Sequence, residues 1–290
     1  MRIYGYVEKG IGKIECQDRV LIGDTILAGG FLAYDSDELP NMLVAVADGV
    51  GGYPGGEKAS LLAVDSIRVL NRRTNLIEDD IRNLLEYTNE QIKQTGMINP
   101  EYEKMATTLT AVVMNSDKAL TIHIGNCRLC TYKKYLQSVT KDQTVVAGMV
   151  SRGEITKEEA KASPLRNQII ACMGGGADSY FEPLVIETNE KLLKQESNLI
   201  LTSDGIHDYL EEETLEDLLN SDCDIQVLCK KIAQSARENG STDDISIIIV
   251  DRLGKYEKTA DNAIEKTMEI ELEEIADEEI EKNTENTVWS

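Results

Sequence analysis

The stretch LVAVADGVGG at residues 43–52 decides how the chain can fold around it. Its run of small and apolar residues predicts a hydrophobic strand over 43–47. A single carboxylate, Asp48, follows the strand. Glycines then stand at three of the next four positions, where Gly51 and Gly52 admit unusual backbone dihedrals and a close approach of a substrate. We therefore expect a rigid strand that carries one charged side chain to the rim of a sheet.

Two further aspartates occupy the same kind of position. Asp204 ends the apolar stretch LILTSD, and Asp243 precedes the strand-like stretch ISIIIV. Three clustered carboxylates repel one another, so they either keep protons or share a cation. Oxygen ligands without His or Cys at ligand spacing favour Mg²⁺ or Mn²⁺ over Zn²⁺, and the carbonyl of Gly49 could be a further ligand. The pairs Asp48-Gly49 and Asp204-Gly205, each taken alone, are also typical of an ordinary strand-ending turn.

The predicted secondary structure indicates an α+β class. Short segments rich in β-branched residues predict strands at 20–27, 43–47, 108–114, 119–124, 198–202 and 245–250. Helical periodicity predicts helices at 57–71, 79–94, 155–161, 212–220 and 224–237. Strictly alternating βαβ units are absent from this order, which favours layered sheets and helices over a parallel α/β sheet.

An ordered set of motifs resembles the metal-dependent protein phosphatase family of the PPM or PP2C type, in its bacterial form. The motifs are VAVADGVGG at 44–52, ATTLTAVVM at 106–114, HIGNCRLC at 123–130, VTKDQTVV at 139–146, GEITKEEAKASPLRNQIIACMGG at 153–175, LILTSDGIHD at 199–208 and GSTDDISIIIV at 240–250. The resemblance implies a β-sandwich of two antiparallel sheets flanked by helices on both outer sides, a four-layer αββα fold. It also implies hydrolysis of phosphoserine and phosphothreonine in proteins by water activated between two Mn²⁺ or Mg²⁺ ions.

The resemblance also assigns residues to roles. Asp48 matches the carboxylate that bridges both metals, and Gly49 matches the residue that offers its carbonyl to one of them. Asp204 and Asp243 match the remaining catalytic metal carboxylates. Lys13 stands where relatives commonly have an arginine, so we expect it to attract the substrate phosphate as a point charge without a two-point contact. Segment 144–171 matches a flap beside the active site.

Two departures from the family pattern remove negative charge near the expected metals. Gln17 replaces a carboxylate that helps hold metal-bound water in relatives, and Asn126 replaces the aspartate that serves a third ion in some of them. A two-ion centre is therefore expected and a third ion is doubtful. The same departures leave open a pseudophosphatase or phosphoprotein-binding regulator that has no turnover. Retention of all three metal aspartates argues against that alternative.

Composition narrows the range of partners. A formal net charge of −22 in 290 residues argues against nucleic-acid binding, which needs clustered Lys and Arg. No segment approaches the roughly 18 apolar residues of a membrane span, and no secretory signal begins the chain. We expect a cytoplasmic monomer with reduced cysteines, whose partners are phosphorylated protein substrates, with a Ser/Thr kinase and its targets as candidates. A zinc or redox site at Cys127 and Cys130 is disfavoured, because no second pair or adjacent histidine accompanies them.

The C-terminal segment differs in composition from the rest of the chain. Residues 254–290 hold twelve acidic residues against four lysines. Ile264, Met268, Leu272 and Ile275 recur at helical spacing on this acidic background. We therefore expect a phosphatase domain over 1–253 and an acidic tail over 254–290 that is partly helical or disordered. A docking helix for the domain or for a partner is the alternative.

Overall fold

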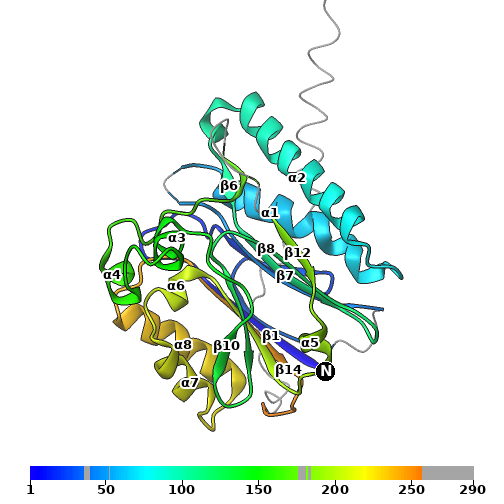
Figure 1. Ribbon diagram of the computed structural model, residues 1–290, viewed down its shortest axis with the longest axis vertical. Helices are drawn as coiled ribbons and strands as arrows, with labels where there is room; N and C mark the ends of the chain where they lie inside the picture. Colours follow the sequence, from blue (N-terminus) through cyan, green and yellow to red (C-terminus); the bar gives the residue numbers. More distant parts are fainter. Residues whose placement is uncertain (36–39, 52, 176–180, 182–183, 257–290) are drawn as a thin grey trace, which may run out of the picture.

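Two six-stranded antiparallel sheets form the centre of the molecule (Figure 1). The computed structural model describes residues 1–35, 40–51, 53–175, 181 and 184–256. In the first sheet the order is β10 (Leu136–Ser138), β9 (Arg128–Tyr132), β13 (Asn198–Thr202), β14 (Ile245–Asp251), β1 (Arg2–Glu8) and β4 (Gly30–Asp35). In the second it is β12 (Val185–Thr188), β8 (Ala119–Ile124), β7 (Leu109–Met114), β5 (Met42–Asp48), β2 (Asp18–Ile22) and β3 (Thr25–Leu27). A short pair, β6 (Ala106–Thr107) and β11 (Met173–Gly174), stands apart from both.

Strand β5 explains why the opening stretch is apolar without alternation. Val44 and Val46 point into the core between the two sheets, with residues of β13 and β14. Leu43, Ala45 and Ala47 point the other way, into a second core beneath helices. Both faces of the strand are therefore dry, and the sequence needs apolar residues at every position.

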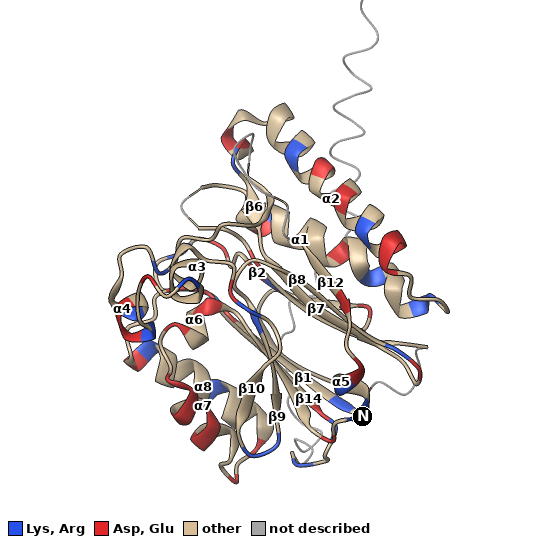
Figure 2. Ribbon diagram, viewed as in Figure 1, with Lys and Arg blue, Asp and Glu red and all other residues tan. Residues whose placement is uncertain are grey.

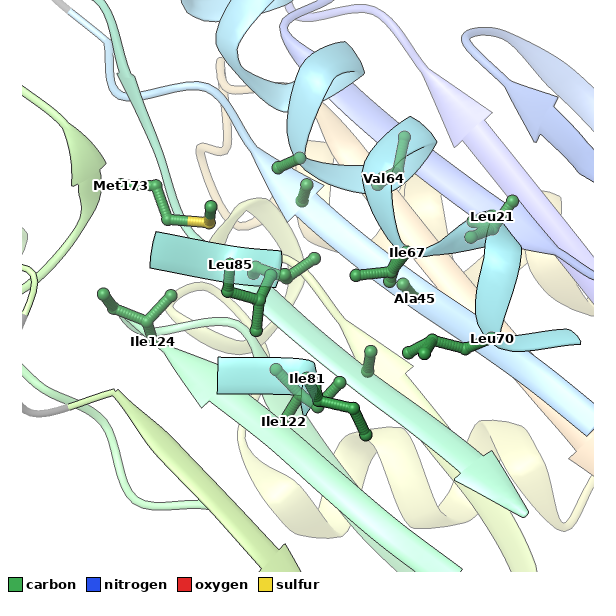
Figure 3. Packing of buried hydrophobic residues seen from close by; sticks show 14 of the residues in the cluster. Leu21, Ala45, Val64, Ile67, Leu70, Ile81, Leu85, Ile122, Ile124 and Met173 are labelled. Carbon is green, nitrogen blue, oxygen red and sulfur yellow. The ribbon is translucent and has the colours of Figure 1, made fainter. Parts of the chain in front are cut away.

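Helices cover the outer face of each sheet. The second sheet is covered by α1 (Gly56–Ile67) and α2 (Glu78–Ile98), whose Val64, Ile67 and Leu85 pack toward Ala45 of the sheet (Figure 3). The first sheet is covered by α7 (Glu212–Leu219) and α8 (Ile225–Glu238) through a third apolar core. The four-layer αββα fold expected from the resemblance is confirmed.

Shorter helices and single turns occupy the connections. They are η1 (Arg68–Arg72), η2 (Pro100–Tyr102), α3 (Val145–Ser151), α4 (Lys157–Ala162), α5 (Glu190–Lys194) and α6 (Asp204–His207). Figure 2 shows that acidic residues occupy α7, whereas α2 carries charges of both signs. None of the helices in the described ranges has the length and apolarity that crossing a bilayer requires.

The prediction of a single strand over residues 20–27 was wrong. Residues 20–27 form two strands, because Gly23 takes a left-handed φ of 60° and turns β2 back onto β3. The predicted helix at 57–71 changes from α-helix to 3₁₀-helix after Ile67. Strands β1 and β4 were not predicted, although both pair at the edge of the first sheet.

The packed structure extends past the expected domain end at residue 253. Tyr256 is 3% exposed and belongs to the core beneath α7 and α8. Its hydroxyl donates to the carbonyl of Leu219 at 3.2 Å, and its backbone N–H donates to Asp251 at 3.0 Å. The apolar stripe of the acidic tail lies outside the described residues.

Two truncations test the contribution of Tyr256. A chain that ends after Leu253 should be less stable than one that ends after Tyr256 by about 3 kcal/mol, the usual cost of removing a buried aromatic side chain. Urea unfolding of the two truncated proteins measures the difference. Equal unfolding midpoints would show that Tyr256 adds nothing to the core.

Candidate metal centre

Strand pairing in the second sheet places two carboxylates side by side. Asp18 at the start of β2 is the cross-strand partner of Asp48 at the end of β5. The backbone of Asp48 is fixed on its other side: its N–H donates to Thr108 Oγ1 at 3.1 Å, and its carbonyl accepts from the Thr108 N–H at 2.9 Å. The Asp48 side chain therefore projects from a strand end whose backbone is rigidly held.

The first sheet contributes the other two predicted aspartates. Asp204 is the first residue of α6, separated from the end of β13 by Ser203 alone, and Asp243 lies two residues before β14. Because β13 and β14 pair antiparallel, the end of β13 and the start of β14 lie side by side at the same end of the sheet. A hydrogen bond joins this edge to the second sheet, since Ser246 Oγ donates to Asp18 Oδ2 at 2.6 Å.

The pKa shifts show that these carboxyls share one electrostatic site. Burial raises the pKa of Asp48 well above its ordinary value, and the negative charges of Asp204, Asp18 and Asp243 raise it further. Burial and the charge of Asp244 raise the pKa of Asp18 to about 7. Burial and the charge of Asp243 raise the pKa of Asp204 to about 6, against the lowering effect of a hydrogen bond from Asn126. Such mutual repulsion is what a bound cation relieves.

Three buried acceptor oxygens in this site lack a donor among the described residues. They are Asp18 Oδ1, Asp204 Oδ1 and Asn126 Oδ1. Buried polar atoms without a partner are rare and costly, unless a ligand or ion satisfies them. Oxygen donors of this kind are the ligands of hard divalent cations. The residues present therefore fit Mg²⁺ or Mn²⁺.

Internal donors hold two of the predicted metal ligands. Asn126 Nδ2 donates to Asp204 Oδ2 at 3.0 Å, and Lys13 Nζ donates to Asp243 Oδ1. In the part of the chain that the structure describes, no three His, Cys, Asp or Glu side chains already converge as metal ligands. The carboxylates are thus gathered at one place, but two of them point at protein donors.

Asp244 was not predicted as a site residue, and the structure places it at the base of the site. It is 1% exposed and accepts backbone N–H groups of Gly10 at 2.6 Å and Gln17 at 2.8 Å. Its Oδ2 also accepts from Lys13 Nζ at 2.9 Å. Burial alone would lower the pKa of Lys13, but the hydrogen bonds that it donates to Asp243 and Asp244 raise it above its ordinary value.

Asp18 was also missed as a site residue. The signal was present in the sequence, because Asp18 is the aspartate of the N-terminal motif that contains Lys13 and Gln17. Its apolar neighbours Val20 and Leu21 already marked a strand, and only the pairing partner was unknown. Register, not composition, puts it beside Asp48.

The glycine loop serves close packing more than unusual dihedrals. A Cβ on Gly49 would lie 2.4 Å from the carbonyl of Gly56, so only glycine fits where β5 passes the start of α1. Gly51 does not take a left-handed φ, whereas Gly55 does, with a φ of 91°. Gly52 lies outside the described residues. The Gly49 N–H donates to the carbonyl of Gln17 at 3.1 Å, which ties the loop to the N-terminal motif.

Gln143, which directly precedes the segment expected to be a flap, is bonded to the loop that carries Asn126. Gly125 and Gln143 exchange two hydrogen bonds, from Gly125 N–H to Gln143 Oε1 at 2.7 Å and from Gln143 N–H to the Gly125 carbonyl at 2.9 Å. Helices α3 and α4 follow, and Lys161 of α4 pairs with Glu211 before α7. In Figure 1 these helices lie at the same end of the molecule as α6.

The two cysteines of the C-x-x-C pair have structural surroundings. Cys127 is buried and its Sγ lies 3.2 Å from Thr108 Oγ1, while burial raises the pKa of the Cys130 thiol in β9 to about 11. Both are free thiols. Neither has the lowered pKa of a reactive or metal-binding cysteine.

Comparison with known proteins assigns the chain to a family. The sequence profile described as protein phosphatase 2C matches residues 15–246, a range that contains both edges of the site. The chain belongs to this family. The protein phosphatase PhpP of Streptococcus pneumoniae is 28% identical over 217 residues, which are 72% of this chain and 85% of that protein. The serine/threonine phosphatase Stp of Listeria monocytogenes is 26% identical over the same share of the chain and 84% of its own length.

Solved structures agree with this protein phosphatase 2C assignment. Serine/threonine phosphatase Stp1 from Staphylococcus aureus superposes with a TM-score of 0.71 at 25% identity, covering 86% of this chain and 93% of that one. The catalytic domain of the phosphatase PstP, solved in complex with two manganese ions, superposes with a TM-score of 0.66 at 23% identity and 86% coverage. At 23% identity, the likeness to the PstP structure supports a shared fold.

Replacement of Asp48 tests the electrostatic reading of this protein phosphatase 2C site. Because its pKa is raised in the folded state, folded Asp48 keeps a proton that the unfolded chain has already lost. The folded state is therefore destabilised by repulsion once Asp48 ionises, so its free energy of unfolding falls as pH rises through the folded pKa. Asp48→Asn should therefore raise the melting temperature in EDTA, by about 2–4 °C per kcal/mol of relieved repulsion, and more at pH 8 than at pH 5. Thermal unfolding at both pH values measures this. A variant that melts lower than the wild type at pH 8 would contradict it.

Proposed function

We propose that this chain is a protein serine/threonine phosphatase that hydrolyses phosphoserine and phosphothreonine with two divalent metal ions. The observation that carries the proposal is the group of carboxylates from both sheets, with buried acceptor oxygens that lack donors among the described residues. Membership in the protein phosphatase 2C family gives this site its reaction class. The relatives PhpP and Stp are named as phosphatases, and Stp as acting on serine and threonine.

We propose Asp48, Asp204 and Asp243, with the carbonyl of Gly49, as the metal ligands. The family fit, the chemistry of the donors and the two manganese ions of the related PstP structure support Mn²⁺ or Mg²⁺ as the cofactor. When bound, such ions supply Lewis-acid activation of water and neutralise charge on the phosphoryl group. A third ion stays doubtful, because Asn126 provides an amide where some relatives have a carboxylate.

The other residues of the site hold these ligands in place. Asn126 fixes the orientation of Asp204 through its 3.0 Å hydrogen bond, and Ser246 fixes Asp18, the carboxylate that lies opposite the ligand Asp48. Lys13 brings a positive charge to the mouth of the site, where we propose that it attracts the substrate phosphate. Its side chain is 26% exposed, which leaves part of it accessible to an incoming dianion.

Phosphorylated proteins are the proposed substrates, and a Ser/Thr kinase that modifies the same targets is the proposed counterpart. The net charge of −22 supports the exclusion of nucleic acid as a ligand. A monomeric state and a cytoplasmic location are part of the same proposal. The acidic tail over 254–290 has no assigned part in the chemistry.

Hydrolysis of p-nitrophenyl phosphate and of a phosphothreonine peptide tests the proposed function. The wild type should turn over both in Mn²⁺ and lose activity in EDTA. Asp204→Asn should reduce kcat/KM by about 1000-fold or more, since loss of a buried group that acts as a unit with its neighbours abolishes most catalysis. Asp217→Asn, an exposed aspartate on α7, is the matched control and should leave the rate unchanged.

The same assay distinguishes an active phosphatase from the alternative, a pseudophosphatase. Asn126 and Lys13 engage two predicted ligands, which favours a pseudophosphatase that binds phosphoproteins without turnover. Such a protein would bind the phosphothreonine peptide and hydrolyse neither substrate at any Mn²⁺ concentration. That result would overturn the proposed enzyme activity.

Lys13 has its own kinetic test at saturating Mn²⁺. As a phosphate attractor it should act on affinity, so Lys13→Ala should raise KM with little change in kcat, and Lys13→Arg should match or improve on the wild type. Steady-state kinetics with the peptide substrate decide this. A large fall in kcat at constant KM would remove Lys13 from substrate binding.

A further inference from the structure

Lys13 lies between two adjacent carboxylates and not in open solvent. Its Nζ donates to Asp243 Oδ1 and, at 2.9 Å, to Asp244 Oδ2. One of these acceptors, Asp243, is a proposed metal ligand. An ammonium and a divalent cation therefore seek the same carboxylate.

The two carboxylates are held with different firmness. The Asp244 side chain has no exposed surface, and its oxygens also accept the N–H groups of Gly10 and Gln17. The Asp243 side chain is 38% exposed, and its Oδ1 also accepts the Asp244 N–H at 2.8 Å. Asp244 is thus a fixed anchor for the ammonium, while Asp243 is open to an ion that arrives from solvent.

We propose that Lys13 is a built-in cation that competes with the divalent metal for Asp243, and that Asp244 is the positioning residue that holds it there. This inference rests on the proposed function. When the metal binds Asp243, the ammonium leaves that carboxylate and stays on Asp244. A lysine can make this move because its charge is a compact point on a flexible stem, unlike the rigid fork of arginine.

The charge of Lys13 reaches the rest of the site. It lowers the pKa of Asp204, against burial and the charge of Asp243, which raise it. Without metal, Lys13 therefore partly offsets the repulsion between Asp204 and Asp243.

Calorimetric titration with Mn²⁺ tests the competition without any assay of activity. Lys13→Met should bind Mn²⁺ about 10- to 100-fold more tightly than the wild type, the range expected when a charged hydrogen bond no longer has to be broken. The same variant should melt at a lower temperature in EDTA, because Asp243 and Asp244 lose their counter-ion. Lys9→Met is the matched control: Lys9 lies in the same loop, and its Nζ contacts the carbonyl of Ile14 at 3.1 Å. It should leave Mn²⁺ affinity unchanged.

A double-mutant cycle separates direct competition from simple charge repulsion. In the wild type, Asp244→Asn leaves the ammonium with Asp243 alone and should weaken Mn²⁺ binding. In Lys13→Met the same substitution should have a much smaller effect. Equal effects in both backgrounds would mean that Lys13 acts through its field alone, which overturns the inference. Circular dichroism establishes that the Asp244 variants fold; if they do not, the comparison of Lys13→Met with Lys9→Met decides.

The possible results are distinct. If Lys13→Met and the wild type bind Mn²⁺ equally, the competition is wrong and the proposed function stands. If no variant and not even the wild type binds Mn²⁺ at millimolar concentration, the metal centre of the proposed function is wrong, and this inference is wrong with it. Tighter binding by Lys13→Met, with coupling to Asp244, supports the inference.

Discussion

Mutual repulsion among carboxylates at one end of the β-sandwich is the constraint on which the rest of the site depends. Burial and the charges of neighbouring carboxylates raise the free energy of ionisation of Asp18, Asp48 and Asp204, as their raised pKa values show. A fold can contain such a cluster only if other groups offset the repulsion among the carboxylates. Here Ser246 and Asn126 donate hydrogen bonds and Lys13 supplies a positive charge. These donors stabilise a site that is otherwise complementary to cations.

The sandwich makes the cluster possible because its strand ends cannot move apart. Pairing of β2 with β5 fixes the two carboxylates of one sheet, and pairing of β13 with β14 fixes the edge that carries the other two. The core between the sheets holds these edges together, and the hydrogen bond from Ser246 to Asp18 crosses from one to the other. Burial of apolar side chains, the dominant favourable term in folding, thus supports an unfavourable charge arrangement.

A chain of backbone contacts links the site to the surrounding loops. Asp244 accepts the N–H of Gln17, and the carbonyl of Gln17 accepts both the Gly49 N–H and the Ser60 hydroxyl. Through these bonds one buried carboxylate orders the N-terminal motif, the glycine loop and the first helix. The close approach of Gly49 to Gly56 leaves no room for a side chain at that point.

The sequence alone determined the parts of this protein that depend on local pattern. The apolar run 43–47 predicted a strand, and Asp48, Asp204 and Asp243 were recognisable because each stands beside a predicted strand. The order of strands and helices indicated an α+β class, and the resemblance to the phosphatase family implied the αββα layers. Helix ends were less certain, since propensity changes gradually along the chain.

The tertiary structure decided which side chains meet. Nothing local in the sequence places Asp18 opposite Asp48, because cross-strand register depends on how two distant segments pair. The same holds for Lys13 and Asp244, which are separated by 231 positions and meet only because β1 and β14 are neighbours. The burial of Asp244 and Tyr256 likewise follows from packing between layers. Local periodicity reports which face of an element is apolar, whereas the partner of each face is set by the folded chain as a whole.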